Sequence, residues 1–265
     1  MHDTFTTLFF QRKITPTLHF ALTLFLLPFI TIETVSAQKP EVIELITYHT
    51  HPPFMTQAGA GLTYDLAQYL NTKSSGKFVF KVRPMSRPRV NMLIAKTQTH
   101  VVPWVNPAWF KDSGMAKYLW TQNALMEDTN AVISRASDAV EYTGPEAFNG
   151  RIFGGIHNHL YTLLDDYINK THMVKRVDAD RHTSNIRKLA KGRIDVTIMP
   201  SSAALYLITQ EDLAEILYIS PRPHSTYSRK MLITKNRSDI QFFLDQAIID
   251  MASDPHWQNI LNRYN

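Results

Sequence analysis

Short β-rich runs alternate with stretches of helical hydrophobic spacing through the chain beyond residue 38. The first run, Glu41–Tyr48, stops at His51-Pro52-Pro53, because proline cannot continue a central strand. The order strand, helix, strand, helix, strand predicts a parallel sheet covered by helices. The strands expected are Glu41–Tyr48, Lys77–Val82 and His100–Val105; the helices carry Leu62, Leu66, Ala67 and Leu70, then Val90, Leu93 and Ile94 after Ser86 and Pro88.

The same order returns after residue 150. The chain then ends in an amphipathic helix that begins at Ser238 and Asp239 and a short helix restarted by Asp254-Pro255. The second set of strands is expected at Arg151–Ile156, Lys175–Val177 and Ile194–Met199, with helical stripes at Leu160, Leu163, Leu164, Tyr167 and Ile168 and at Ile186, Leu189 and Ala190 before Gly192.

Two such units predict an α/β protein with two similar lobes. The segments Thr121–Ser134 and Leu217–Leu232 connect the units, so the chain crosses between them twice. We expect lobe 1 to contain residues 38–130 and 226–265 and lobe 2 to contain residues 131–225, with the two crossing segments as a hinge. A hinge between α/β lobes forms a ligand cleft, and ligands bind at the carboxyl ends of the strands.

Residues Phe20–Ala37 contain an apolar run of roughly 13 residues and end in small residues. Arg12 and Lys13 precede the run, and Val35-Ser36-Ala37 has the small-x-small pattern of a cleavage site. The run is shorter than the roughly 20 apolar residues that a membrane span needs. We therefore expect residues 1–37 to be a signal peptide cleaved near Ala37, which places the protein in the periplasm. An uncleaved anchor is the alternative.

Charge and cysteine content narrow the class of protein. The chain has 28 basic and 23 acidic residues, a net charge of +5 and no cysteine. Its basic residues are scattered among acids, so nucleic acid is not an expected partner. Without cysteine there is no disulfide, thiolate metal site or cysteine nucleophile. An exported protein held by its core alone fits a bacterial periplasm.

An ordered set of motifs resembles the family-3 extracellular solute-binding proteins, the amino-acid-type binding proteins of ABC importers. His51–Phe54 and Gly61–Ala67 are similar to the family's Pro-Phe turn and Asp-Leu-Ala helix, and Asn149–Gly154 and Leu189–Val196 to its second-lobe units. The ending DMASDPHWQNILNRY is similar to the family's terminal helices. The resemblance covers nearly all of residues 38–265 and implies the type 2 periplasmic-binding fold.

Three positions depart from the pattern of that family. Its members carry, after the third strand, an arginine that holds the ligand's α-carboxylate, whereas Trp104–Asp112 contains no arginine. Asn158 and His159 replace the family's Gly-Ser/Thr helix start, and Thr197–Ser201 lacks the aspartate that receives the ligand's ammonium. Unpaired buried charges cost several kcal/mol. We therefore expect a ligand other than a standard α-amino acid held in the usual way.

Aromatic residues at predicted strand ends are candidate ligand contacts. Tyr48, Phe54, Trp104 and Trp109 could sandwich an organic ligand or a cation, with ordinary core or hinge packing as the alternative. Arg87 opens the second helix and could grip a carboxylate in place of the missing loop arginine. A solvated helix face is the alternative for Arg87.

Polar residues at other strand ends are further candidates. Asn106 could bond a ligand amide or hydroxyl, or could be a turn residue before Pro107. Asn158 and His159 lie between a strand and a predicted helix, whose first N–H groups favour an anion. Ser201 follows the last strand of lobe 2 and could contact ligand or only cap a helix.

Two His-x-His pairs, His49/His51 and His157/His159, give a metal-binding alternative. Residues i and i+2 of a strand point the same way, so four imidazoles could hold a zinc-like ion or a metal chelate across the cleft. Loop histidines facing water are the competing interpretation.

The function expected is solute binding without catalysis. The sequence has no Gly-x-Ser-x-Gly elbow, His-Glu-x-x-His or P-loop, so we expect neither an enzyme nor a cofactor. A periplasmic enzyme on the same scaffold is the alternative. We expect a monomer that closes around a small polar solute and delivers it to a separate inner-membrane partner, either an ABC permease or a signalling receptor.

Overall fold

The computed structural model describes residue 7 and residues 39–96, 99–234 and 236–264. Gln38–Asn265 form one compact unit. The predicted signal peptide, residues 1–37, lies outside the described residues except for Thr7. Within the described ranges, no helix has the length and apolar character needed to cross a bilayer.

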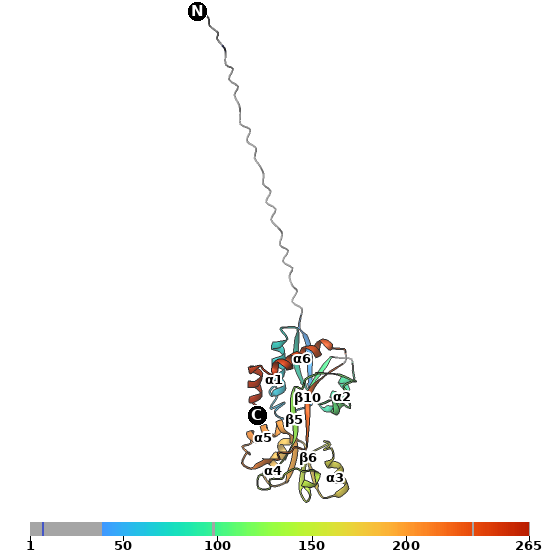
Figure 1. Cartoon of the computed structure of the whole chain (residues 1–265), viewed down its shortest axis with the longest axis vertical. Coiled ribbons are helices and arrows are strands. Elements are labelled where there is room, and N and C mark those ends of the chain that lie inside the picture. The colour runs from blue at the N-terminus through green and yellow to red at the C-terminus, as the bar shows by residue number, and fades with distance from the viewer. Residues whose placement is uncertain (1–6, 8–38, 97–98, 235, 265) are drawn as a thin grey trace, which may run out of the picture. The chain divides into compact units, whose positions relative to one another are not determined.

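A mixed sheet runs through the unit, in the order β2-β1-β3-β10-β5-β8-β6-β7, with β4 paired to β10 and β9 paired to β5 (Figure 1). We call the half that carries β2, β1 and β3 lobe 1 and the half that carries β8, β6 and β7 lobe 2. The strands are β1 (Glu41–Thr47), β2 (Phe78–Pro84), β3 (His100–Val105), β4 (Leu119–Trp120), β5 (Met126–Arg135), β6 (Ile152–Ile156), β7 (Lys175–Ala179), β8 (Val196–Pro200), β9 (Leu217–Ile219) and β10 (Ser225–Ile233).

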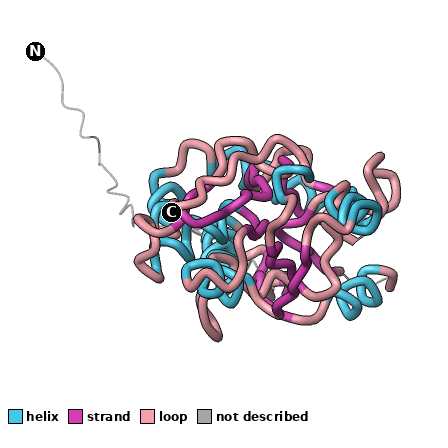
Figure 2. Tube along the Cα trace, turned by 90° about the horizontal axis from the view of Figure 1, so that it is seen from below, coloured by secondary structure: helices cyan, strands magenta, loops and turns pink. Residues whose placement is uncertain are grey.

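Helices surround the strands, as the view along the molecule shows (Figure 2). Three of them start where the sequence predicted: α2 after Ser86, α6 at Ser238 and α7 after Asp254. The side chain of Asp254 accepts a hydrogen bond from the N–H of His256 at 2.9 Å. The helices are α1 (Leu62–Lys73), α2 (Arg87–Ile94), α3 (Leu164–Thr171), α4 (His182–Ala190), α5 (Ser201–Gln210), α6 (Ser238–Met251) and α7 (Pro255–Asn262), with 3-10 helices at Pro107–Phe110 and Pro145–Phe148.

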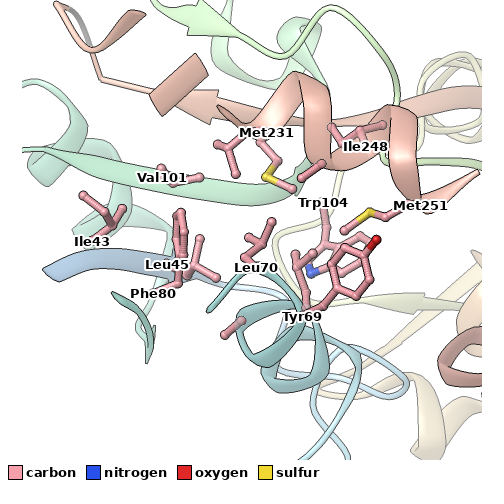
Figure 3. Packing of buried hydrophobic residues seen from close by; sticks show 14 of the residues in the cluster. Ile43, Leu45, Tyr69, Leu70, Phe80, Val101, Trp104, Met231, Ile248 and Met251 are labelled. Atoms are coloured by element: carbon pink, nitrogen blue, oxygen red, sulfur yellow. The ribbon is translucent and has the colours of Figure 1, made fainter. Parts of the chain in front are cut away.

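Lobe 1 packs apolar side chains on both faces of its sheet. Strands β1, β2 and β3 are parallel, and successive residues of β1 point to opposite faces. Leu45 therefore joins the cluster that packs under α1, α6 and α7, whereas Ile46 joins the cluster under α2. Figure 3 shows the first cluster, in which Trp104 lies beside Tyr69 and Met251. Burial on both faces explains why β3 is apolar almost throughout.

Strand β10 belongs to both lobes. Ser225–Arg229 pair antiparallel with β5, and Lys230–Ile233 pair with β3. Strand β5 in turn pairs with β8 through Asn130–Ser134. The two crossing segments expected from the sequence are therefore β5 and β10, lying side by side (Figure 1).

Two predicted element boundaries in lobe 2 are wrong. Leu160 and Leu163 were expected on a helix, but they are 83% and 68% exposed, and α3 begins only at Leu164. The backbone of Leu163 has φ of 67°, a left-handed conformation that a helix cannot contain. The strand predicted at Lys175–Val177 continues to Ala179, because it pairs with β6 up to Ile156.

Candidate functional site

A cluster of aromatic and imidazole rings lies where the chain leaves β1. His49 is 6% exposed, and its ring centroid lies 5.4 Å from that of Phe54 and 5.7 Å from that of His51. The ring of Tyr48 also packs against His49, with ring centroids 4.2 Å apart. This cluster stands at the carboxyl end of β1, the edge at which ligands of parallel sheets bind.

His51 of this cluster meets a histidine of lobe 2. Its ring centroid lies 5.2 Å from that of His182, the first residue of α4, and the rings are nearly perpendicular. A cavity of about 550 Å³ opens beside the two rings. Its wall includes Thr50, His51 and Met55 from lobe 1 and Ile156, Asp180, Arg181, His182 and Thr183 from lobe 2.

His51 and His182 on the cavity wall and the neighbouring His49 are neutral at neutral pH. Burial lowers the pKa of His49 and His51 well below the ordinary value, and the nearby Arg229 lowers both further. Burial also lowers the pKa of His182 to about 4, with additional contributions from His159 and Arg229. In the described part of the chain, Nε2 of His49, Nε2 of His51 and Nδ1 of His182 are buried and have no hydrogen-bond partner.

A buried ion pair joins the two crossing strands behind the rings. Nε of Arg229 on β10 donates to Asp128 on β5 at 2.8 Å, and each side chain is 1% exposed. The other guanidinium nitrogens donate to the carbonyl of Trp104 at 2.8 Å and to the hydroxyl of Tyr227 at 3.1 Å. The guanidinium also lies 4.7 Å from the ring centroid of Phe54. All its nitrogens are thus engaged within the protein.

Asp128 also ties the start of α5 to the hinge. It accepts hydrogen bonds from the hydroxyls of Ser201 at 2.7 Å and Ser202 at 2.8 Å. Burial acts to raise the pKa of Asp128, but the charge of Arg229 and the serine hydroxyls outweigh burial, so the pKa is lowered. The carboxylate therefore stays ionised inside the hinge. The hydroxyl of Ser201, a predicted ligand contact, therefore donates its hydrogen bond to this carboxylate.

Arg87 is engaged within lobe 1. It donates to Asn91 at 2.9 Å, to the hydroxyl of Tyr48 at 2.8 Å and to the carbonyl of Trp109, and its guanidinium lies 4.0 Å from the ring centroid of Phe110. Burial raises the pKa of Tyr48 to about 12, although Arg87 acts to lower it. The structure therefore uses Arg87 to hold the aromatic wall in place.

Three other predicted residues serve the scaffold around the cluster. Trp104 is fully buried and donates its indole N–H to Thr63 at 3.1 Å, and Phe54 is fully buried beside it. Asn106 caps the following 3-10 helix and donates to the carbonyl of Ser228 at 2.9 Å. Trp109, in contrast, is only partly buried, between Tyr227 and His49.

Asn158 and His159 do not stand at a helix start, because α3 begins five residues later, at Leu164. Arg176 holds their loop, donating to the carbonyls of Ile156 at 3.2 Å and His159 at 3.0 Å. The ring of His159 packs on Tyr161, with centroids 4.6 Å apart, and lies close enough to His51 and His182 to lower their pKa values. The helix start beside the cavity belongs to α4 instead.

The four-histidine metal site is not formed. His157 is turned toward acidic residues, with ring nitrogens 3.9 Å from Asp178 and 3.9 Å from Asp180. Over the described ranges, no three His, Cys, Asp or Glu side chains are placed to hold a metal ion. His49, His51 and His159 do gather in one region, but their partner there is His182, which the His-x-His pattern does not include.

Sequence reasoning missed the residues at the centre of this site. Asp128 lies in the first segment predicted to cross between the lobes, and Arg229 lies in the second. An acidic residue in one β-rich segment and a basic residue in the other was the sequence signal that could have indicated this pair. His182 follows the strand predicted at Lys175–Val177. The rule that ligands bind at strand carboxyl ends would have found His182 if applied to that strand.

No family model and no curated protein matches the chain. Solved structures do match its fold. An ancestral arginine-binding protein bound to arginine is 17% identical, covers 85% of this chain and 99% of its own, and has a TM-score of 0.64. The GluR0 ligand-binding core from Nostoc punctiforme in complex with L-glutamate is 13% identical, covers 85% and 99%, and has a TM-score of 0.63.

A third similar structure comes from work on glutathione import through GshT and the cystine ABC importer TcyBC of Streptococcus mutans. It is 16% identical, covers 85% of this chain and 95% of its own, and has a TM-score of 0.63. These matches confirm the α/β, two-lobed periplasmic-binding-protein fold predicted from the sequence. At such low identity they concern the fold alone.

Proposed function

We propose that this protein binds a small polar solute between its lobes in the periplasm and presents it to a separate membrane partner, either an ABC permease or a receptor. One observation carries the proposal. His51 of lobe 1 and His182 of lobe 2 face one cavity of about 550 Å³, and each has a buried nitrogen without a partner in the described residues. Such nitrogens are costly unless a ligand or water satisfies them.

A solute that bonds both imidazoles would link the two lobes. Such a ligand stabilises the closed arrangement because it contacts both lobes only when they are together. Residues near the cavity supply suitable chemistry: Trp109 and Tyr48 offer aromatic surface around His49, and His159 adds a further imidazole near His51 and His182. Asn158 is exposed near this edge and belongs to the proposed contact set with them. Phe54, Trp104, Asn106 and Ser201 support the set from behind.

The proposed solute differs from an α-amino acid held in the usual way. Arg87 was the expected substitute for the loop arginine, but its guanidinium nitrogens donate hydrogen bonds to Tyr48, Asn91 and Trp109. Arg229 is neutralised by Asp128. Neither guanidinium is free to receive a carboxylate at the position that the resemblance implies. The similar structures support solute binding as a class, since those named above bind arginine, glutamate or concern glutathione import.

A thermal-shift screen of the purified protein against small polar solutes tests this proposal. A true ligand raises the unfolding midpoint in proportion to the logarithm of its concentration above Kd. The double variant H51Q/H182Q should lose most of that shift, while H172N, which changes an exposed histidine outside the cavity, should keep it. A complete screen of amino acids, peptides, sugars, polyamines and organic acids without any stabilising solute would refute the proposal.

A further inference from the structure

The amino-terminal end of α4 faces the cavity without a cap. Arg181 occupies the N-cap position, no side chain caps the helix, and its first turn contains no acidic residue. Among the described residues, no group accepts a hydrogen bond from the N–H of His182 or Thr183, whereas those of Ser184 and Asn185 reach the carbonyl of Arg181. Unsatisfied N–H groups at a helix start carry partial positive charge and attract anions.

The guanidinium of Arg181 stands beside this helix end and is not paired. Within the described ranges it makes no hydrogen bond and no ion pair, although Arg176, Arg187 and Arg229 are each paired with a carboxylate. Arg181 is exposed on the cavity wall. A free guanidinium in a solute cavity can bind a carboxylate or phosphate through two parallel hydrogen bonds.

Two histidines on the cavity wall support an anion site independently of the helix end. His51 and His182 line the cavity, and Nε2 of His51 and Nδ1 of His182 are buried without a hydrogen-bond partner in the described structure. A neutral imidazole carries one N–H, and the tautomer with hydrogen on the unpaired nitrogen donates to an oxygen. The cavity thus gathers donors from a helix end, a guanidinium and two rings. The carboxylate on its wall is that of Asp180, which is 89% exposed and lies 3.9 Å from His157.

We propose that this cavity binds the oxyanion group of its solute, a carboxylate or a phosphate, at the amino-terminal end of α4, between Arg181, His182 and His51. This inference rests on the proposed function and names the chemistry of the ligand. The subsite differs from both positions where the family resemblance placed anion binding, the loop after β3 and the loop after β6. It also explains why the loop arginine is dispensable, since Arg181 supplies the guanidinium from the other lobe.

Calorimetric titration of the purified full chain with two probes, inorganic phosphate and succinate, tests the inference at fixed ionic strength. Putrescine and glucose are titrated as a cationic and a neutral probe. We expect phosphate or succinate to bind, and R181Q to weaken that binding about tenfold, the loss typical of one charge-assisted contact. K191Q removes the same charge from the other end of α4 and should change the affinity less than about twofold. D180N should strengthen the binding, because it removes the negative charge from the wall.

The outcomes separate this inference from the proposed function. Equal effects of R181Q and K191Q on the bound anion would overturn the inference, because the charge would then act at a distance and not in a subsite. A protein that binds putrescine, glucose or another solute without an anionic group, and ignores both anions, would overturn the inference but leave solute binding intact. Failure of every solute class to bind would overturn the proposed function itself.

Discussion

At the scale of single residues, the pair Arg229–Asp128 is the least exposed ion pair in the described part of the chain, at 1% for each side chain. It is buried, fully hydrogen-bonded and shared by the two strands that cross between the lobes. Loss of one partner from a buried pair leaves the other charge unpaired in a low dielectric. The pair therefore sets the geometry of the hinge, on which the position of both halves of the cavity depends.

Removing one partner of this pair should destabilise the protein strongly. We expect D128A to lower the free energy of unfolding by about 3–5 kcal/mol, the range for a broken buried pair. Urea denaturation followed by tryptophan fluorescence measures this change. The control is E211Q, which breaks the exposed pair with Arg187 and should cost far less. Similar losses of unfolding free energy in D128A and E211Q would show that burial does not make the Arg229–Asp128 pair more important than an exposed pair.

The lowered pKa of His182 predicts a second effect: the free energy of unfolding should fall in acid. The pKa of His182 falls from 6.5 in the unfolded chain to about 4 in the folded protein, because of burial and the facing groups His159 and Arg229. Between these values the unfolded chain binds more protons, so the free energy of unfolding rises with pH. The stabilisation is complete above about pH 6.5 and is lost as the pH falls toward 4.

Denaturant titrations between pH 4.5 and 7.5 would measure that slope. H182Q should flatten it, because glutamine does not titrate, and H172N should leave it unchanged. A slope that is the same in H182Q as in the parent protein would show that His182 does not resist protonation.

At the scale of elements, the approach of β6 to its neighbours requires glycine. A Cβ on Gly154 would lie 2.3 Å from Cδ1 of Ile194 and 3.2 Å from Oδ1 of Asn185, a buried residue whose amide donates to the carbonyls of Gly154 and Gly155. The close packing of β6 holds its last residue, Ile156, on the cavity wall.

We expect G154A to lower the free energy of unfolding by about 1–3 kcal/mol, the usual cost of overpacking a core. G114A is the matched control, because no atom lies within 4 Å of a Cβ built there. Thermal unfolding of the two variants would check this. A midpoint for G154A as high as that of G114A would mean that Ile194 moves aside without cost.

The order of strands and helices could be predicted from the sequence because each element carries its own periodicity. The failure at Leu160 and Leu163 has a physical cause: both fit a helical stripe, yet the loop before α3 exposes them. The pairing of Asp128 with Arg229 could not be predicted, since it joins residues 101 apart through the register of β5 and β10. His182 could have been predicted as a site residue, because it follows the carboxyl end of a predicted strand.

At the scale of the whole molecule, the proposed solute binding requires the two lobes to move about β5 and β10. The cavity is lined from both sides, and its unpaired imidazoles belong to different lobes. A solute that satisfies both should favour the closed arrangement, whereas a fixed scaffold would gain nothing from it. The lobe boundaries at residues 130 and 226 remain a prediction. The residues about which the lobes move would locate these boundaries.

Small-angle X-ray scattering of the purified protein, with and without the solute that gives the largest thermal shift, tests this central claim most directly. We expect a smaller radius of gyration at saturating solute, and no such decrease in H51Q/H182Q at the same concentration. An unchanged radius of gyration in the parent protein, with the solute shown by calorimetry to be bound, would contradict closure of the lobes around the ligand.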